Sequence, residues 1–506
     1  MKPAPSLPGQ RNDIHAVMAS GFGWLQSSRF SLLTIRNVLL ARAWLVSLEQ
    51  SGLVKSVGCV TEQRSLGIKP CELASIAFSF TGLRMLELVE STQFPFPTAF
   101  RSGMGSDLRK ELLRDGERDK WQWSDHDTEP RQAPSRSVHI LLAHWWQTAT
   151  ASTLPVPDAA AFSVREIHGC PSFFRDDTLY EAFGFRDGIS QPTIYGVKDL
   201  SDEGEEVALS PQEMKTRRDN VVAAGEFILG YRNEYDELSC CADVQGWVAT
   251  GADAHPGARF ALNGSYLAVR QIDQDLEGFA KLHAQGAAGC PSHVSLAEKM
   301  MGRRQDGAPL GACPVRPLVV PTENGACSDA PPANPPLLTD SQANAFRYRV
   351  EDENGFITPR GSHIRRANPR DTLGHDVQSG VLSSKLHRLL RRGRPYRSVG
   401  DAGKPTAGLF FIACNTDLER QFEFVHQRWL MNPRFADLEN EDDPVVGAPS
   451  LKKTFSLPGL PAGETVSFQS FTTTLGGGYF FLPGLKALRF IATHSPPSPV
   501  RANLTS

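Results

Sequence analysis

Short apolar runs typical of strands alternate with helix-length runs along the whole chain, and this alternation limits the fold more than any other feature of the sequence. In the first half, strands are predicted at residues 30–35 and 75–80. Each is followed by a run with apolar residues at helical spacing, at 39–48 and 83–88. Residues 138–146 mix apolar side chains with two histidines and fit either a strand or a helix.

The second half repeats this pattern. We predict strands at 226–231, 265–270 and 408–413, helices at 276–284 and 416–429, and a hairpin-like pair of apolar runs at 471–482. Similar units in both halves favour an α+β architecture of two related domains. The charged, apolar-poor segment 199–220 predicts a domain boundary near residue 210, and the Pro-rich segment 314–339 predicts a loop.

Charge and composition exclude several classes of protein. The net charge of −3 over 506 residues gives no reason to expect nucleic acid as a partner. No run reaches the roughly 18 apolar residues of a membrane helix, and the N-terminus has no apolar core of a secretory signal, so we expect a cytoplasmic protein without a membrane partner. The nine cysteines form no C-x-x-C pair, which excludes a thioether-linked haem of that type and gives no indication of zinc.

The first motif that could carry chemistry is G-F-R-D-G-I-S-Q-P, with Asp187 between two glycines on a turn closed by Pro192. Glycines such as Gly188 let the backbone approach a flat ligand closely. Taken alone, Asp-Gly is a common turn dipeptide, and an ordinary turn is the better interpretation.

Two further motifs are rich in arginine. In P-R-G-S-H-I-R-R-A-N-P-R, His363 is surrounded by guanidinium groups; a neutral imidazole can ligate haem iron, and arginines can pair with carboxylates. In L-R-R-G-R-P-Y, Arg391 supplies a permanent positive charge that could stabilise an anion. In isolation, each motif also fits a solvated basic surface. The other histidines, among them His426, have no ligand-like context and are expected in the core or on the surface.

Together and in this order, the three motifs resemble those of the dye-decolourising peroxidases, in particular the longer members of that family. Flanking segments that look similar include A-E-K-M-M-G-R-R-Q-D-G-A-P-L and G-Y-F-F-L-P, and the resemblance covers roughly residues 10 to 495. The resemblance implies two ferredoxin-like domains with antiparallel sheets, at 1–210 and 211–506. It places haem mainly in the second domain and supplies Asp187 to it from the closing loop of the first.

The resemblance also assigns the site residues. It makes His363 the proximal iron ligand, backed by an acidic residue of E-D-D-P that is Asp443, with neighbouring Asp442 left open. It places Asp187 and Arg391 on the distal face as the pair that handles peroxide. Arg365 and Arg366 are candidates to pair with the haem propionates, and strand alternation would direct only one of them there. The same alternation would bring only one of Phe410 and Phe411 to the distal wall, and we select Phe411.

The implied function is that of a haem b peroxidase with non-covalently bound cofactor. Such an enzyme reduces hydrogen peroxide and oxidises dyes, phenolics or other one-electron donors through a ferryl intermediate. Two alternatives remain: an enzyme that releases iron from the porphyrin, and a haem carrier or sensor without catalysis. The presence of both Asp187 and Arg391 argues against a mere carrier. A homo-oligomer is compatible with the sequence.

Overall fold

The computed structural model describes residues 7–114, 121–126, 136–175, 178–197, 218–249, 259–284, 294–311, 337–399, 405–447, 450, 452–458 and 464–494. The predicted boundary at residue 210 and most of the predicted loop 314–339 lie outside these residues. No helix within the described part is long and apolar enough to cross a bilayer.

The N-terminal half forms an antiparallel sheet in the order β5-β1-β4-β2. Its strands are β1 (Ser27–Ile35), β2 (Glu72–Phe78), β4 (Ile140–Trp146) and β5 (Phe162–Gly169). The segment at 138–146, which the sequence left open, is therefore a strand. Helices α2 (Val38–Gln50) and α4 (Phe80–Met85) follow these strands near the predicted positions, and α3 (Val57–Ser65) is a further helix that was not predicted.

The C-terminal half forms a second antiparallel sheet in the order β12-β13-β10-β16. Its strands are β10 (Ser265–Gln274), β12 (Arg394–Val399), β13 (Pro405–Asn415) and β16 (Thr472–Leu482). When the four strands of each sheet are numbered along the chain, their spatial order is 4-1-3-2 in both sheets. The mixed helices and antiparallel sheets agree with the expected pair of ferredoxin-like units.

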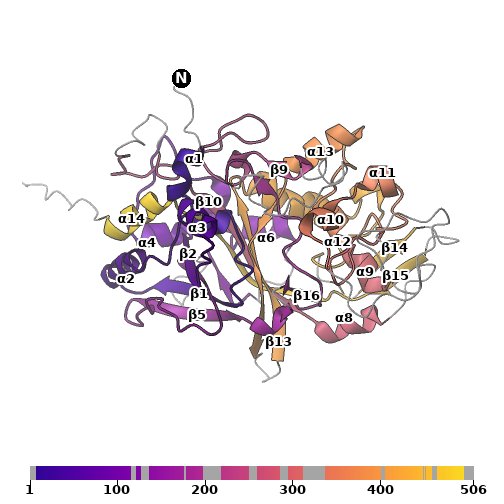
Figure 1. Cartoon of the computed structure of the whole chain (residues 1–506), viewed down its shortest axis with the longest axis horizontal. Coiled ribbons are helices and arrows are strands. Elements are labelled where there is room, and N and C mark those ends of the chain that lie inside the picture. The colour runs from indigo at the N-terminus through magenta and orange to yellow at the C-terminus, as the bar shows by residue number, and fades with distance from the viewer. Residues whose placement is uncertain are drawn as a thin grey trace, which may run out of the picture.

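The two sheets meet at both edges, through the pairs Tyr396–Gly169 and Phe481–Phe78, and lie next to each other at the centre of the molecule (Figure 1). A buried apolar layer lies between them, in which Phe30 of β1 stacks on Phe410 of β13 with ring centroids 4.4 Å apart. A second apolar layer covers the outer face under the helices. There helix α14 (Leu485–Thr493), from the C-terminal half, packs against α2 of the N-terminal half.

Two strand predictions were wrong. Residues 226–231 form no strand, because a short 3₁₀ turn, Ala224–Glu226, precedes them and Gly230 has a φ of +92°. Residues 471–482 are not a hairpin but one strand, β16, which pairs with β10 on one side. The glycines that suggested a turn, Gly476 and Gly477, instead let β3 (Trp123–Ser124) pass closely along the other side.

Candidate functional site

One cavity of about 300 Å³ brings together side chains from distant parts of the chain. Its wall combines the turn around Asp187, strands β10 and β13, and helix α12 (His363–Ala367). Apolar side chains make up much of the wall, including Ile272, Leu389, Leu409, Phe411, Phe422 and Val425. A mostly apolar cavity with a few polar groups is the usual form of a cofactor site.

His363 is the first residue of α12, and its imidazole borders the cavity. Its Nδ1 lies 3.0 Å from Oδ2 and 3.2 Å from Oδ1 of Asp443. Since the carboxylate accepts the hydrogen bond, Nδ1 carries the hydrogen and Nε2 keeps the lone pair that a metal requires. Of the two candidate acids, Asp443 and not Asp442 lies against the histidine.

Asp443 is fully buried but remains ionised. Burial alone would raise its pKa, yet the charge and hydrogen bond of His363, followed by the charge of Arg366, hold that pKa at about 2. Its Oδ1 also accepts hydrogen bonds from the backbone N–H groups of Val445 and Val446, at 2.8 and 2.9 Å. This carboxylate is therefore fixed in both position and charge.

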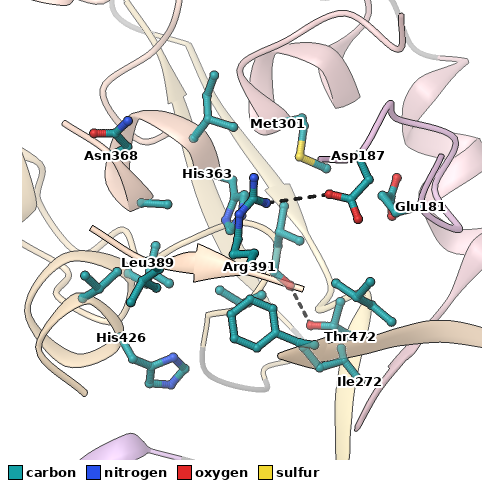
Figure 2. A pocket seen from close by; sticks show the side chains of 18 of the residues that line it. Glu181, Asp187, Ile272, Met301, His363, Asn368, Leu389, Arg391, His426 and Thr472 are labelled. Carbon is teal, nitrogen blue, oxygen red and sulfur yellow. Dashed lines mark hydrogen bonds and ion pairs between the residues drawn. The ribbon is translucent and has the colours of Figure 1, made fainter. Parts of the chain in front are cut away.

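Asp187 and Arg391 face each other across another part of the same cavity (Figure 2). Asp187 Oδ1 lies 3.9 Å from Arg391 Nη1, and it accepts a 2.6 Å hydrogen bond from the backbone N–H of Gly188. Gly188 has a φ of +83°, a conformation that glycine adopts without strain. The turn thus aims the carboxylate at the guanidinium.

Arg391 ends the short strand β11 (Leu390–Arg391), which pairs with β13. Its Nη2 donates to the backbone oxygen of Ile189 at 2.8 Å, and its backbone N–H donates to Gln191 at 2.9 Å. These contacts connect the arginine to the turn that carries Asp187, so the two charged groups are held as one unit.

Strand alternation in β13 separates the two phenylalanines as expected. Phe411 borders the cavity, whereas Phe410 is fully buried between the sheets.

Arg365 and Arg366 do not border the cavity, and the strand prediction for this segment was wrong because it is the helix α12. Arg365 donates to the backbone oxygens of Asp352 and Thr358, both at 2.8 Å. Arg366 is fully buried and donates to the backbone oxygens of Gly361, Trp429, Leu430, Asn432 and Glu441. Both guanidinium groups brace the loops behind His363, which leaves neither to pair with a propionate in the cavity.

Other arginines border the cavity, among them Arg303, Arg304, Arg370 and Arg388. Burial, followed by the charge of Arg370, lowers the pKa of Arg303 to about 9. Arg304 is the most informative, because its Nε and Nη2 are buried and have no hydrogen-bond partner among the described residues. Buried guanidinium nitrogens without a partner are costly unless an anion completes the site. Its position in M-G-R-R-Q was visible in the sequence, but nothing there distinguished it from a surface arginine.

Glu181 is a further residue that the sequence did not reveal, and it borders the cavity beside Asp187 (Figure 2). Its carboxylate accepts hydrogen bonds from the backbone N–H groups of Phe183 and Phe185 and from Gln274, at 3.0, 2.9 and 2.7 Å. Burial raises the pKa of Glu181 to about 7 against these hydrogen bonds, and the charge of Asp187 adds to the rise. Through these hydrogen bonds, the Glu181 carboxylate holds together the segment that leads to Asp187.

The predicted helix at 416–429 is present but widened into π-helix over η7 (Glu419–Glu423) and η8 (Val425–Leu430). Segments of this type are rare and often occur at functional sites. Here the wider turn brings Phe422, Val425 and His426 to the cavity wall. His426, expected in the core or on the surface, is buried and lies at the cavity.

Comparisons with known proteins agree with this arrangement. A family model described as the C-terminal part of Dyp-type peroxidases matches residues 227–448. The dye-decolorizing peroxidase msp1 of Mycetinis scorodonius is 25% identical over 471 residues, which cover 87% of this chain and 80% of that protein.

Solved structures show the same fold. The Dyp-type peroxidase of Anabaena superposes with a TM-score of 0.68 at 20% identity, over 96% of this chain and 95% of its own. A dye-decolorizing peroxidase solved in complex with 2,6-dimethoxyphenol superposes with a TM-score of 0.64 at 21% identity, over 95% of this chain and 99% of its own.

Proposed function

Since the chain belongs to the dye-decolourising peroxidase family, we propose that it is a haem peroxidase. We infer that it reduces hydrogen peroxide and oxidises dyes or phenolic compounds. One observation carries the proposal. His363, whose Nδ1 is paired with the buried carboxylate of Asp443, borders the same mostly apolar cavity as the carboxylate–guanidinium pair of Asp187 and Arg391.

The residues of the cavity fit haem b held without a covalent bond. His363 offers Nε2 to the iron, the apolar wall suits a porphyrin, and the unsatisfied nitrogens of Arg304 suit a propionate. Arg304 therefore replaces Arg365 and Arg366 as the propionate partner in our proposal. When bound, haem supplies a redox-active iron at which the O–O bond of peroxide can be cleaved.

Asp187 is proposed to move the proton of the peroxide. Its carboxylate could accept a proton from one oxygen of the peroxide and return it to the other, as general acid–base catalysis requires. The hydrogen bond from Gly188 and the ion pair with Arg391 hold the Asp187 carboxylate in a fixed position for this role.

Arg391 is proposed to stabilise the negative charge that develops on the departing oxygen. Its contacts with Ile189 and Gln191 fix the guanidinium before the substrate arrives, so little reorganisation is needed during the reaction.

His363 and Asp443 are proposed to set the electron donation to the metal. The hydrogen bond at Nδ1 fixes the orientation of the ring and increases its basicity, which favours the oxidised states of the metal. We also propose that the domain boundary lies near residue 210, so that the first domain contributes the Asp187 turn to a site built mainly from the second.

The test is to load the purified chain with haem, add one equivalent of hydrogen peroxide and then a phenolic donor, and record the absorption spectrum. A peroxidase gives a rapid spectral change that the donor reverses, with one peroxide consumed for two donor oxidations. An unchanged ferric spectrum would indicate a carrier, and loss of iron with free porphyrin would indicate the iron-releasing enzyme. Either of these outcomes overturns the proposal.

A further inference from the structure

Two adjacent aspartates could in principle accept the hydrogen of His363 Nδ1, but only Asp443 does so. The side chain of Asp442 points elsewhere, to Lys453, with its Oδ1 3.3 Å from Nζ. The question is what holds the segment so that the second aspartate, and not the first, reaches the histidine.

Lys453 opens strand β14 (Lys453–Leu457) and is only 5% exposed. Its ammonium group donates a 2.5 Å hydrogen bond to the backbone oxygen of Asp443 while it pairs with the Asp442 carboxylate. Burial lowers the pKa of Lys453, and the charges of Asp442 and Asp443 act against that fall. Burying an unpaired cation is unfavourable, and here the Asp442 carboxylate and the Asp443 backbone oxygen compensate for the burial of the ammonium group.

The space around the ammonium group is narrow. A Cβ added at Gly447 would collide with Lys453 Nζ and with the backbone oxygen of Asp443. Arg366, a second buried cation, donates to the backbone oxygen of Glu441. Two buried cations thus hold this segment, one at Glu441 and one at Asp443.

We propose that Lys453 is a positioning residue of the proximal couple: it draws the Asp442 carboxylate away and holds the Asp443 backbone so that the Asp443 carboxylate meets His363 Nδ1. This inference rests on the proposed role of His363 as the iron ligand. It explains why an E-D-D sequence yields a single, defined partner for the histidine.

The test compares Lys453→Met with Lys452→Met, which removes the same charge from the exposed neighbouring side chain. In the haem-free protein with isotope-labelled histidine, we expect Lys453→Met to speed the solvent exchange of the His363 Nδ1 hydrogen at least tenfold, because its acceptor is displaced. In the haem-loaded protein, the iron–histidine stretching frequency should fall. The ratio of ferrous to ferric protein at a fixed potential should rise by about tenfold, which corresponds to about 59 mV for one electron.

Gly447→Ala provides a second route to the same result, because it forces the three groups apart without removing a charge. It should shift all three readouts in the same direction as Lys453→Met, while Lys452→Met leaves them at the wild-type values. The inference is overturned if the exchange rate and the reduction potential of Lys453→Met and Gly447→Ala match those of the wild type. A protein that takes up no haem would contradict the proposed function instead, and the measurement on the haem-free chain would still decide the role of Lys453.

Discussion

The pairing of Asp187 with Arg391 predicts that their contributions to the peroxide reaction depend on each other. Asp187→Asn and Arg391→Leu each remove one member, and both variants should still bind haem because neither residue is the proposed iron ligand. Each single change should slow the reaction with peroxide by about 10²- to 10⁴-fold, the usual range for loss of a general base or of an electrostatic stabiliser.

The magnitude of the coupling follows from the geometry. Two unit charges separated by 3.9 Å interact by about 4 kcal/mol at an effective dielectric constant of ~20, and by about 1 kcal/mol in water. The Arg391 side chain is 39% exposed, so the value lies between these limits, at about 1–3 kcal/mol. The double variant should therefore be about 5- to 150-fold faster than the product of the two single effects predicts.

The assay is a stopped-flow measurement of the haem absorption after mixing with peroxide, on the wild type, the two single variants and the double variant at equal haem content. Arg397→Leu is the matched control, since Arg397 is an exposed arginine on the neighbouring strand β12 that does not border the cavity. If the two single effects multiply fully in the double variant, the two side chains act independently, and the paired mechanism is wrong.

Two other predictions concern the cavity. Because the pKa of Glu181 is raised to about 7 in the folded state, the folded protein binds this proton more tightly than the unfolded chain does. The resulting contribution to stability is complete below pH ~4.5 and is lost as the pH rises through about 7. In urea titrations of the haem-free protein, the free energy of unfolding of the wild type should fall by up to about 3 kcal/mol over this pH range relative to that of Glu181→Gln. If the two proteins lose the same free energy of unfolding with pH, this prediction is wrong. Arg304→Ala should weaken haem binding by roughly 10- to 150-fold, because the loss of a charged hydrogen bond costs about 1.5–3 kcal/mol. The measurement is the rate of haem transfer from each protein to an acceptor globin. An unchanged transfer rate would exclude Arg304 as the propionate partner.

The sequence located the residues with strong local motifs and missed those that only the fold brings together. Asp187, His363 and Arg391 belong to segments whose composition is unusual, and all three border one cavity. The choice between Asp442 and Asp443 could not be made from the sequence, because it depends on the contact of Lys453 with both residues.

The errors have a common physical origin. Arg365 and Arg366 were candidates because they follow His363, and strand alternation was expected to direct one of them to the haem. The segment is helical, and both guanidinium groups donate to backbone oxygens of neighbouring loops. Arg304 and Glu181 carried no periodic signal, since a single charged residue in a loop acquires its role only from burial. The triple glycine of β16 marked close strand packing, which in a sequence looks the same as a turn.

The central claim is that His363 binds the iron, and a cavity variant tests it most directly. His363→Gly should leave space for a free imidazole, so the measurement is a haem titration followed by absorption, with and without added imidazole. The account predicts that the wild type binds one haem per chain with the spectrum of a histidine-ligated iron, and that His363→Gly reaches that spectrum only when imidazole is present. A variant that binds haem with the wild-type spectrum in the absence of imidazole would contradict the account.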